Sequence, residues 1–149
     1  MDKEITIPVS SVCATAAETF ALGEKLGATL SGGEVILLSG PLGAGKTLFT
    51  KGIASALGFD ETEVNSPSFT LVNEYDADLV IYHIDLWRID DPANAAFSVG
   101  LEELLEDEAS IKVIEWAERL GEHLFTAETI RVEISGDGDA ERKITISRT

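Results

Sequence analysis

A glycine-rich octapeptide carries the clearest chemical signal in the chain. Residues 40–47 read Gly-Pro-Leu-Gly-Ala-Gly-Lys-Thr, which matches the pattern G-x-x-x-x-G-K-[ST] at every fixed position. Glycine has no Cβ, so its backbone can take positive φ and bring N–H groups close to phosphate oxygens. In such a loop the lysine, here Lys46, reaches the β- and γ-phosphates, and the hydroxyl of Thr47 coordinates Mg²⁺. The octapeptide therefore predicts a site for a nucleoside triphosphate.

The residues on either side of the loop favour the same site. Val35–Leu38 is a short apolar run with glycines before and after it, which is typical of a strand buried on both faces. Residues 47–57 carry apolar side chains at helical spacing and end at Gly58. A strand, a glycine loop and a helix are the context that phosphate binding needs. We expect the nucleotide to contact the end of the loop and the start of the helix, at Gly43, Ala44, Gly45, Lys46, Thr47 and Leu48.

Two carboxylates follow apolar strands elsewhere in the chain. Asp85 ends the run 79–84, and Glu115 ends the run 111–114. Enzymes with this type of loop hold their metal with a carboxylate, and open α/β sheets place ligands at the carboxyl ends of their strands. One of the two acids could hold Mg²⁺ while the other polarises the attacking water, and the pattern leaves open which does which. The alternative is that either acid is an ordinary solvated residue at a strand end.

Two further polar features lie near these motifs. The hydroxyls of Ser66-Pro67-Ser68 could meet the γ-phosphate or the metal, as a switch segment does, or they could belong to a routine turn. Arg88 is the one basic residue between Lys51 and Lys112. It could stabilise charge in a transition state, although pairing with a nearby acid is the simpler interpretation.

The histidines and tryptophans are interpreted more simply. His83 and His123 have no metal-ligand spacing, so we expect them to be packed or on the surface. Trp87 and Trp116 lie beside the two acids, and we expect each to belong to the core rather than to stack on a base.

Composition limits the function classes. The 149 residues include 27 acidic and 11 basic side chains, for a net charge of −16, and such a surface repels nucleic acid and anionic membranes. The chain has one cysteine, Cys13, expected to be a packed thiol, and no apolar run of membrane-spanning length. We therefore expect one cytoplasmic domain over residues 1–149, with no direct tRNA binding by the isolated chain and no membrane contact.

The order of elements predicts the fold class. We expect an α/β domain, a three-layer sandwich like that of P-loop NTPases with a mixed sheet, and an antiparallel β-hairpin inserted after the helix that follows the loop. Before the loop, we expect an edge strand over 4–9 and a helix capped by Ser10, Ser11 or Thr15 and ended by 31–33. After it, we expect a loop at 59–66, hairpin strands at 68–75 and 79–85, helices at 91–97 and 101–105, a strand at 111–115, a helix at 116–120, and a hairpin of 129–135 with 142–147.

Four segments together resemble one known family. They are the loop at 40–47, Ser-Pro-Ser-Phe-Thr-Leu-Val at 66–72, His-Ile-Asp-Leu-Trp-Arg at 83–88, and Glu115-Trp116. In this order and spacing they resemble the TsaE (YjeE) family, small bacterial ATPases required for threonylcarbamoyladenosine modification of tRNA at position 37. The glycine loop alone is shared by many unrelated proteins, whereas the combination is specific, and the resemblance covers nearly the whole chain.

The resemblance implies roles for individual residues. It implies Mg²⁺-dependent ATP hydrolysis, slow without partners, by an enzyme that assembles with the TsaD and TsaB proteins. Catalysis would fall to Lys46, Asp85, Glu115 and Ser68, and the metal to Thr47, Asp85 and Glu115. The chain departs from the family pattern at Pro41, often Asp, at Ser68, more often Thr, and at Trp87, usually Tyr. None of these changes removes a required functional group.

Three other functions compete with this one. A small-molecule P-loop kinase needs several basic residues to clamp its second substrate, and between Lys51 and Lys112 the chain offers only Arg88. A Ras-type GTPase needs D-x-x-G after the acid and N-K-x-D elsewhere, and the chain has neither. A non-catalytic nucleotide-sensing module stays open, because slow, partner-gated hydrolysis has the same sequence signature.

Overall fold

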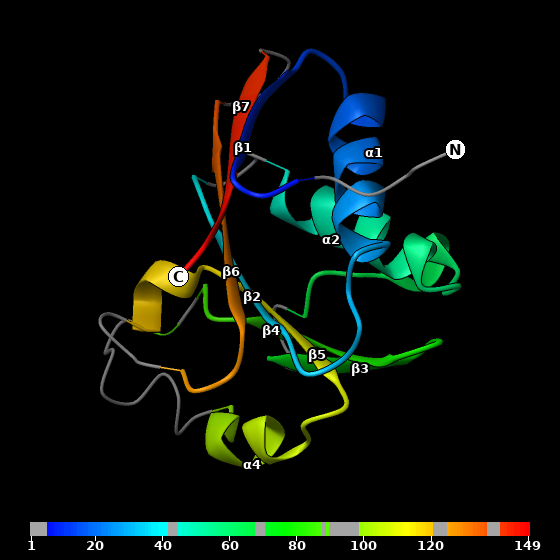
Figure 1. Ribbon diagram of the computed structural model, residues 1–149, viewed down its shortest axis with the longest axis vertical. Helices are drawn as coiled ribbons and strands as arrows, with labels where there is room; N and C mark the ends of the chain where they lie inside the picture. Colours follow the sequence, from blue (N-terminus) through cyan, green and yellow to red (C-terminus); the bar gives the residue numbers. More distant parts are fainter. Residues whose placement is uncertain are drawn as a thin grey trace.

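Seven strands form one mixed β-sheet in the computed structural model, which describes residues 6–41, 45–67, 71–87, 89, 99–120, 125–136 and 141–149. The strand order is β1-β7-β6-β2-β5-β4-β3 (Figure 1). The strands are β1 (Val9–Cys13), β2 (Val35–Ser39), β3 (Val72–Asp76), β4 (Val80–Asp85), β5 (Ile111–Glu115), β6 (Thr129–Ser135) and β7 (Arg142–Arg148).

The central strands β6, β2, β5 and β4 run parallel to one another. Strands β3 and β7 run antiparallel to their inner neighbours, and β1 runs antiparallel to β7. The predicted antiparallel pairing of the two strands around Asp76–Asp78 is therefore present, as is the hairpin near the C-terminus. Because four neighbouring strands are parallel, their carboxyl ends meet at one edge of the sheet, where α/β sheets bind ligands.

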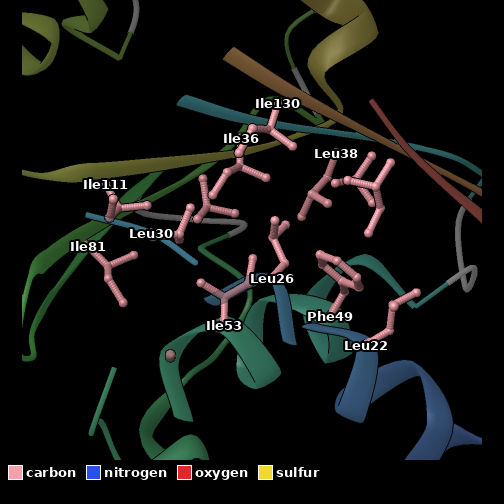
Figure 2. Close-up of a cluster of buried hydrophobic side chains, with 14 of the residues drawn as sticks. Leu22, Leu26, Leu30, Ile36, Leu38, Phe49, Ile53, Ile81, Ile111 and Ile130 are labelled. Atoms are coloured by element: carbon pink, nitrogen blue, oxygen red, sulfur yellow. The ribbon is translucent and has the colours of Figure 1, made fainter. Parts of the chain in front are cut away.

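Side chains from both faces of the sheet are buried. Helices α1 (Ala16–Gly27) and α2 (Lys46–Ala56) cover one face, where Ile36 and Leu38 of β2 pack among helix residues such as Leu26, Phe49 and Ile53 (Figure 2). On the other face, Val35 and Leu37 pack with residues of α4 (Leu101–Glu106) and of the 3₁₀ helix η2 (Ala117–Leu120). Figure 1 shows η2 on the side of the sheet opposite α1 and α2. Alternate residues of β2 thus enter two separate cores, which explains its wholly apolar sequence.

The N-terminal strand lies later in the chain than predicted. The strand expected at 4–9 is β1 at Val9–Cys13, which pairs with β7 from Val9↔Ile146 to Cys13↔Arg142. The prediction was wrong because Pro8, which has no N–H, precedes this pairing rather than taking part in it. Ser10 and Ser11 therefore lie in the strand and do not cap the helix. Thr15 does cap it, since its hydroxyl accepts the N–H of Glu18 at 3.2 Å.

Other boundaries differ by smaller amounts. The strand expected at 68–75 begins at Val72 in the described chain, directly after Leu71 with its φ of 68°. The loop at 59–66 contains a 3₁₀ turn, η1 (Glu61–Glu63), and the short helix near 116–120 is the 3₁₀ helix η2. The helix expected at 91–97 lies outside the described residues. Cys13 is buried, as predicted, and none of the helices in the described ranges is long and apolar enough to cross a membrane.

Candidate functional site

The two predicted acids are neighbours at the carboxyl edge of the sheet. Strands β4 and β5 pair in parallel with Asp85 opposite Glu115, and β2 pairs with β5 so that Leu38 is opposite Glu115. The chain leaves β2 at this same edge and enters α2, which has Gly45 as its N-cap with a φ of 108°. Only glycine takes this conformation at little cost, so Gly45 turns the loop directly into the helix. The acids and the start of α2 therefore share one edge of the sheet.

The hydroxyl of Thr47 contacts the carboxylate of Glu115. Its Oγ1 lies 3.1 Å from Oε1 and 3.1 Å from Oε2, and it donates to them across 68 residues of sequence. Glu115 is buried, with 3% of its surface exposed. The family resemblance implies Thr47, Asp85 and Glu115 as metal ligands, and the structure brings the oxygens of Thr47 and Glu115 together.

Lys46 lies against the loop that precedes it. Its Nζ donates to the carbonyl oxygens of Gly40 at 2.7 Å and Pro41 at 2.9 Å, and it lies 4.0 Å from the centroid of the Trp116 ring. Burial lowers the pKa of the Lys46 ammonium, while the carboxylates of Glu115, Glu118 and Asp85 act in the opposite direction. The cation is thus held beside the loop by carbonyl dipoles and an aromatic face.

Asp85 is held by different partners from those of Glu115. Ser66 Oγ donates to its Oδ2 at 2.9 Å, and the backbone N–H of Trp87 donates to its Oδ1 at 2.9 Å. One oxygen of Asp85 is therefore tied to the segment after η1 and the other to its own turn. The sequence left two interpretations of Ser66 open, a contact with a phosphate or metal or a routine turn, and in the structure its hydroxyl contacts this acid.

His83 contacts Glu115 from the other side. Its Nε2 contacts Glu115 Oε2, its Nδ1 lies 2.8 Å from the hydroxyl of Tyr75, and none of its surface is exposed. The sequence predicts a packed or a surface histidine at position 83; the structure shows a packed one, and its contact with Glu115 was not predicted. Strand periodicity puts His83 on the same face of β4 as Asp85, because they are two residues apart, but only the pairing of β4 with β5 brings His83 to Glu115.

Trp116 lies beside Lys46, and Trp87 packs against Trp116. The rings of Trp87 and Trp116 are 4.6 Å apart between centroids, and Trp87 is 36% exposed, so the prediction that it belongs to the core is wrong. Trp116 has a φ of 59°, a left-handed conformation that costs a bulky residue about 1–2 kcal/mol. The residue in this unfavourable conformation, Trp116, is the one whose ring lies against the Lys46 ammonium.

A second cation lies beside the start of α2. A Cβ built on Gly45 would lie 3.4 Å from Nε of Arg142, the first residue of β7. The sequence predicts no role for Arg142, because its position in the final hairpin gives no sign of proximity to a loop about a hundred residues earlier. Lys46 and Arg142 together bring positive charge to one edge of a strongly acidic chain.

The described residues suit Mg²⁺ only in combination with other oxygen donors. Thr47 and Glu115 offer a hydroxyl and a carboxylate, which are hard oxygen ligands. Within the described part of the chain, no group of three or more His, Cys, Asp or Glu side chains could hold a metal by itself. Magnesium is commonly held by one or two carboxylates together with substrate phosphates and water, so this donor set fits a Mg²⁺–nucleotide complex.

A family model described as "Threonylcarbamoyl adenosine biosynthesis protein TsaE" matches residues 13–144. The chain belongs to the TsaE family. It is 40% identical to the tRNA threonylcarbamoyladenosine biosynthesis protein TsaE of Bacillus subtilis over 131 residues, 87% of this chain and 79% of that protein. The corresponding protein of Treponema pallidum is 38% identical over 91% of this chain and 98% of its own length.

The fold agrees with this membership. The crystal structure of Bacillus subtilis YdiB superposes with a TM-score of 0.73 at 33% sequence identity, and the match covers 96% of this chain and 86% of that one. Parts of all four segments that carry the resemblance to TsaE meet at the carboxyl edge of the sheet. Thr47 bonds to Glu115, His83 contacts Glu115, and Ser66 bonds to Asp85.

The predicted site residues of this TsaE chain divide into two groups. The structure brings together Lys46, Thr47, Asp85 and Glu115, with Gly45 at the N-cap and Leu48 half-buried in the first turn of α2. Gly43, Ala44, Ser68, Arg88 and His123 lie outside the described residues, so their predicted roles stay predictions.

Proposed function

We propose that this chain binds ATP with Mg²⁺ at the edge formed by the loop at 40–47, Asp85 and Glu115, and hydrolyses the nucleotide. We further propose that it is the ATP-dependent component of the machinery that makes threonylcarbamoyladenosine at position 37 of tRNA, acting on a complex of TsaD and TsaB. The observation that carries the proposal is the contact between Thr47 and Glu115 at the start of α2, beside Lys46. The family's name supplies the pathway.

Lys46 and the helix would bind the phosphates. The N-terminus of the eleven-residue helix α2 carries partial positive charge, which favours an anion at that end. The Lys46 ammonium donates to the carbonyls of Gly40 and Pro41, and phosphate oxygens would be stronger, charged acceptors for the same donor. Arg142 adds a second positive charge beside Gly45. These groups would position the triphosphate and offset its charge.

We assign the metal to Thr47 and Glu115. The Thr47 hydroxyl already contacts both oxygens of Glu115, whereas the described contacts of Asp85 are with Ser66 and Trp87. Thr47 and Glu115 would hold the ion, whose positive charge would offset the negative charge on the phosphate oxygens. This proposal gives the metal to Glu115 and leaves Asp85 for the attacking water, an alternative that the sequence left open.

Asp85 would then act on the attacking water. Its carboxylate is oriented by the Ser66 hydroxyl and the Trp87 N–H, and each of its oxygens keeps a lone pair for a further donor. A carboxylate held in this way can accept a hydrogen bond from water and orient it toward a phosphorus atom. Ser68 lies two residues beyond Ser66, and we propose that it belongs to the segment that responds to the γ-phosphate.

ATP turnover with and without the partner proteins tests this function. We expect slow hydrolysis by the isolated chain and a clear increase when TsaD and TsaB are added. Hydrolysis should require Mg²⁺ and should stop when the ion is chelated. ATP binding without hydrolysis in either condition would favour the non-catalytic sensing module, and phosphate transfer to a small molecule would favour a kinase.

We also expect that the isolated chain does not bind tRNA at physiological salt. Binding requires clustered Lys and Arg to neutralise phosphates, and here 11 basic side chains face 27 acidic ones. A mobility-shift titration measures tRNA binding by this chain alone and then in the presence of TsaD, TsaB and ATP. Tight binding by the chain alone would contradict a role that acts through partners.

A further inference from the structure

A chain of buried polar contacts leads away from the candidate metal site. Thr47 bonds to Glu115, Glu115 contacts His83, His83 Nδ1 lies 2.8 Å from the Tyr75 hydroxyl, and that hydroxyl donates to the carbonyl of Asn65 at 3.1 Å. His83, Glu115 and Tyr75 are 0%, 3% and 4% exposed. The contacts run from α2 through β5, β4 and β3 to the segment after η1. They therefore connect parts of the chain that are distant in sequence.

The hydrogen bonds hold Glu115 from both sides. An ionised carboxylate can only accept, so the hydrogen between His83 and Glu115 belongs to His83 Nε2. On the other side of the carboxylate, the Thr47 hydroxyl donates. If an ion takes the place of the Thr47 hydrogen bond, the His83 bond stays. His83 is thus placed to fix the direction in which Glu115 presents its oxygens, as outer partners of metal ligands do.

The series of polar contacts that begins at Thr47 ends at Asn65, next to the residue that bonds to Asp85. Asn65 accepts from Tyr75 at 3.1 Å and from Asn73 Nδ2 at 3.2 Å through its backbone carbonyl. The next residue, Ser66, donates to Asp85 at 2.9 Å. Two adjacent residues of one segment therefore touch both acids, Asp85 directly and Glu115 through Tyr75 and His83. A shift of Glu115 along this route would displace the same segment that orients Asp85.

Packing alone does not explain these side chains. His83 shares a face of β4 with Ile81, and Val113 is opposite it on β5, so an aliphatic side chain would suit the position. Burying an imidazole and a phenol hydroxyl costs free energy unless they have polar partners. Here both ring nitrogens of His83 have a polar partner, Glu115 at Nε2 and the Tyr75 hydroxyl oxygen at Nδ1, and the one hydrogen of that hydroxyl is directed to Asn65. His83 and Tyr75 are therefore better explained by the polar contacts that they make with each other, with Glu115 and with Asn65 than by packing.

We propose that His83 and Tyr75 are positioning residues for Glu115, and that they couple the Mg²⁺–nucleotide state of Glu115 to the segment Val64–Pro67. This proposal rests on the proposed ATP and Mg²⁺ binding and names the route by which that binding reaches the neighbouring segment. Ser68 follows this segment directly, so a displacement at Asn65 and Ser66 would act on the predicted switch.

Variants of the two residues separate positioning from mere packing. Tyr75→Phe removes only a hydroxyl, and Tyr82→Phe on β4 is the matched control, because Tyr82 is half-buried and lies opposite Glu74, away from this route. His83→Leu removes the donor to Glu115, while His83→Gln keeps an N–H donor in a similar position. The measurement is ATP affinity by calorimetry, with Mg²⁺ and with the ion chelated.

We expect Tyr75→Phe and His83→Leu to reduce the gain in ATP affinity that Mg²⁺ provides by about tenfold, in line with other outer partners of metal ligands. Affinity without the ion should change less than about twofold, because Lys46 and the loop are untouched. His83→Gln should recover most of the loss, and Tyr82→Phe should match the parent. Equal losses with and without Mg²⁺ would make the two residues structural, and parent-like behaviour of Tyr75→Phe and His83→Leu would also overturn the proposal.

Hydrogen exchange of the backbone amides at 64–66 tests the second half of the proposal. ATP with Mg²⁺ should slow this exchange in the parent and in Tyr82→Phe, but much less in Tyr75→Phe. In the ligand-free protein, Tyr75→Phe should exchange faster than Tyr82→Phe at the same amides, and equal rates would overturn the link to Asn65. If the folded parent binds no ATP, the proposed function is wrong. The comparison of exchange rates in ligand-free Tyr75→Phe and Tyr82→Phe would still show whether Tyr75 holds the segment at Asn65.

Discussion

Replacing Lys46 with alanine is expected to lower the affinity for ATP by about a hundredfold or more while the fold stays intact. Lys46 carries the sole charged side chain in residues 40–47, and its Nζ lies beside the loop carbonyls and the Trp116 ring. Hydrogen bonds to charged groups contribute about 1.5–3 kcal/mol each. If Lys46 donates two such bonds to phosphate oxygens of ATP, losing both lowers the affinity by about two orders of magnitude or more.

Calorimetric titration with ATP measures the effect, and Lys51→Ala is the matched control. Lys51 lies in the same helix, and its Nζ points to the carbonyl of Glu61 rather than to the loop, so its removal deletes one positive charge without touching the proposed site. We expect Lys51→Ala to bind ATP nearly as the parent does. Circular dichroism should show both variants folded. Unchanged affinity in folded Lys46→Ala would remove the loop from the proposed site.

Neutralising either acid should separate hydrolysis from binding. Asp85→Asn and Glu115→Gln keep the shape of the side chain and remove its negative charge. If the acids act on water and metal, hydrolysis should fall by roughly a hundredfold or more in each, because such groups supply several kcal/mol of transition-state stabilisation. ATP should still bind, since Lys46 and the helix start are unchanged.

The Mg²⁺ dependence distinguishes the two acids. With Thr47 and Glu115 as metal ligands, Glu115→Gln should need a higher Mg²⁺ concentration for ATP binding, whereas Asp85→Asn should bind with the parent's Mg²⁺ dependence and fail in turnover. Glu118→Gln is a suitable control, because Glu118 is an exposed acid near Lys46, whereas the described hydrogen bonds of the Thr47 hydroxyl go to Glu115. Turnover near that of the parent in both acid variants would mean that the acids are structural.

Much of the fold was predictable because it depends on local patterns. Apolar runs predicted β2, β4 and β5, and helical spacing ended by Gly58 predicted α2 to within about one residue at each end. The short polar connection at 76–78 predicted an antiparallel pair, since so few residues cannot make a parallel crossover. The N-terminal strand was misplaced by several residues, because its true partner is β7 at the far end of the chain.

The sequence by itself predicted the chemistry of the candidate site and identified four of the residues that the structure brings together there. The spacing of Lys46 and Thr47 and the position of Asp85 and Glu115 at the ends of apolar strands are local properties, so the residue types alone predicted a phosphate-binding loop facing two carboxylates. The family resemblance came from the same residues and needed no coordinates.

Only the tertiary structure decided how these residues are connected. The order of β2, β5 and β4 in the sheet sets Asp85 opposite Glu115 and brings His83 to the same carboxylate. Strand order and register depend on the summed packing of the two cores, and no local pattern encodes a partner 32 residues away, which is the separation of His83 from Glu115. The contacts of Ser66 with Asp85 and of Tyr75 with Asn65 arise in the same way, because a hydrogen bond between distant segments exists only after the sheet has placed its donor and acceptor within reach.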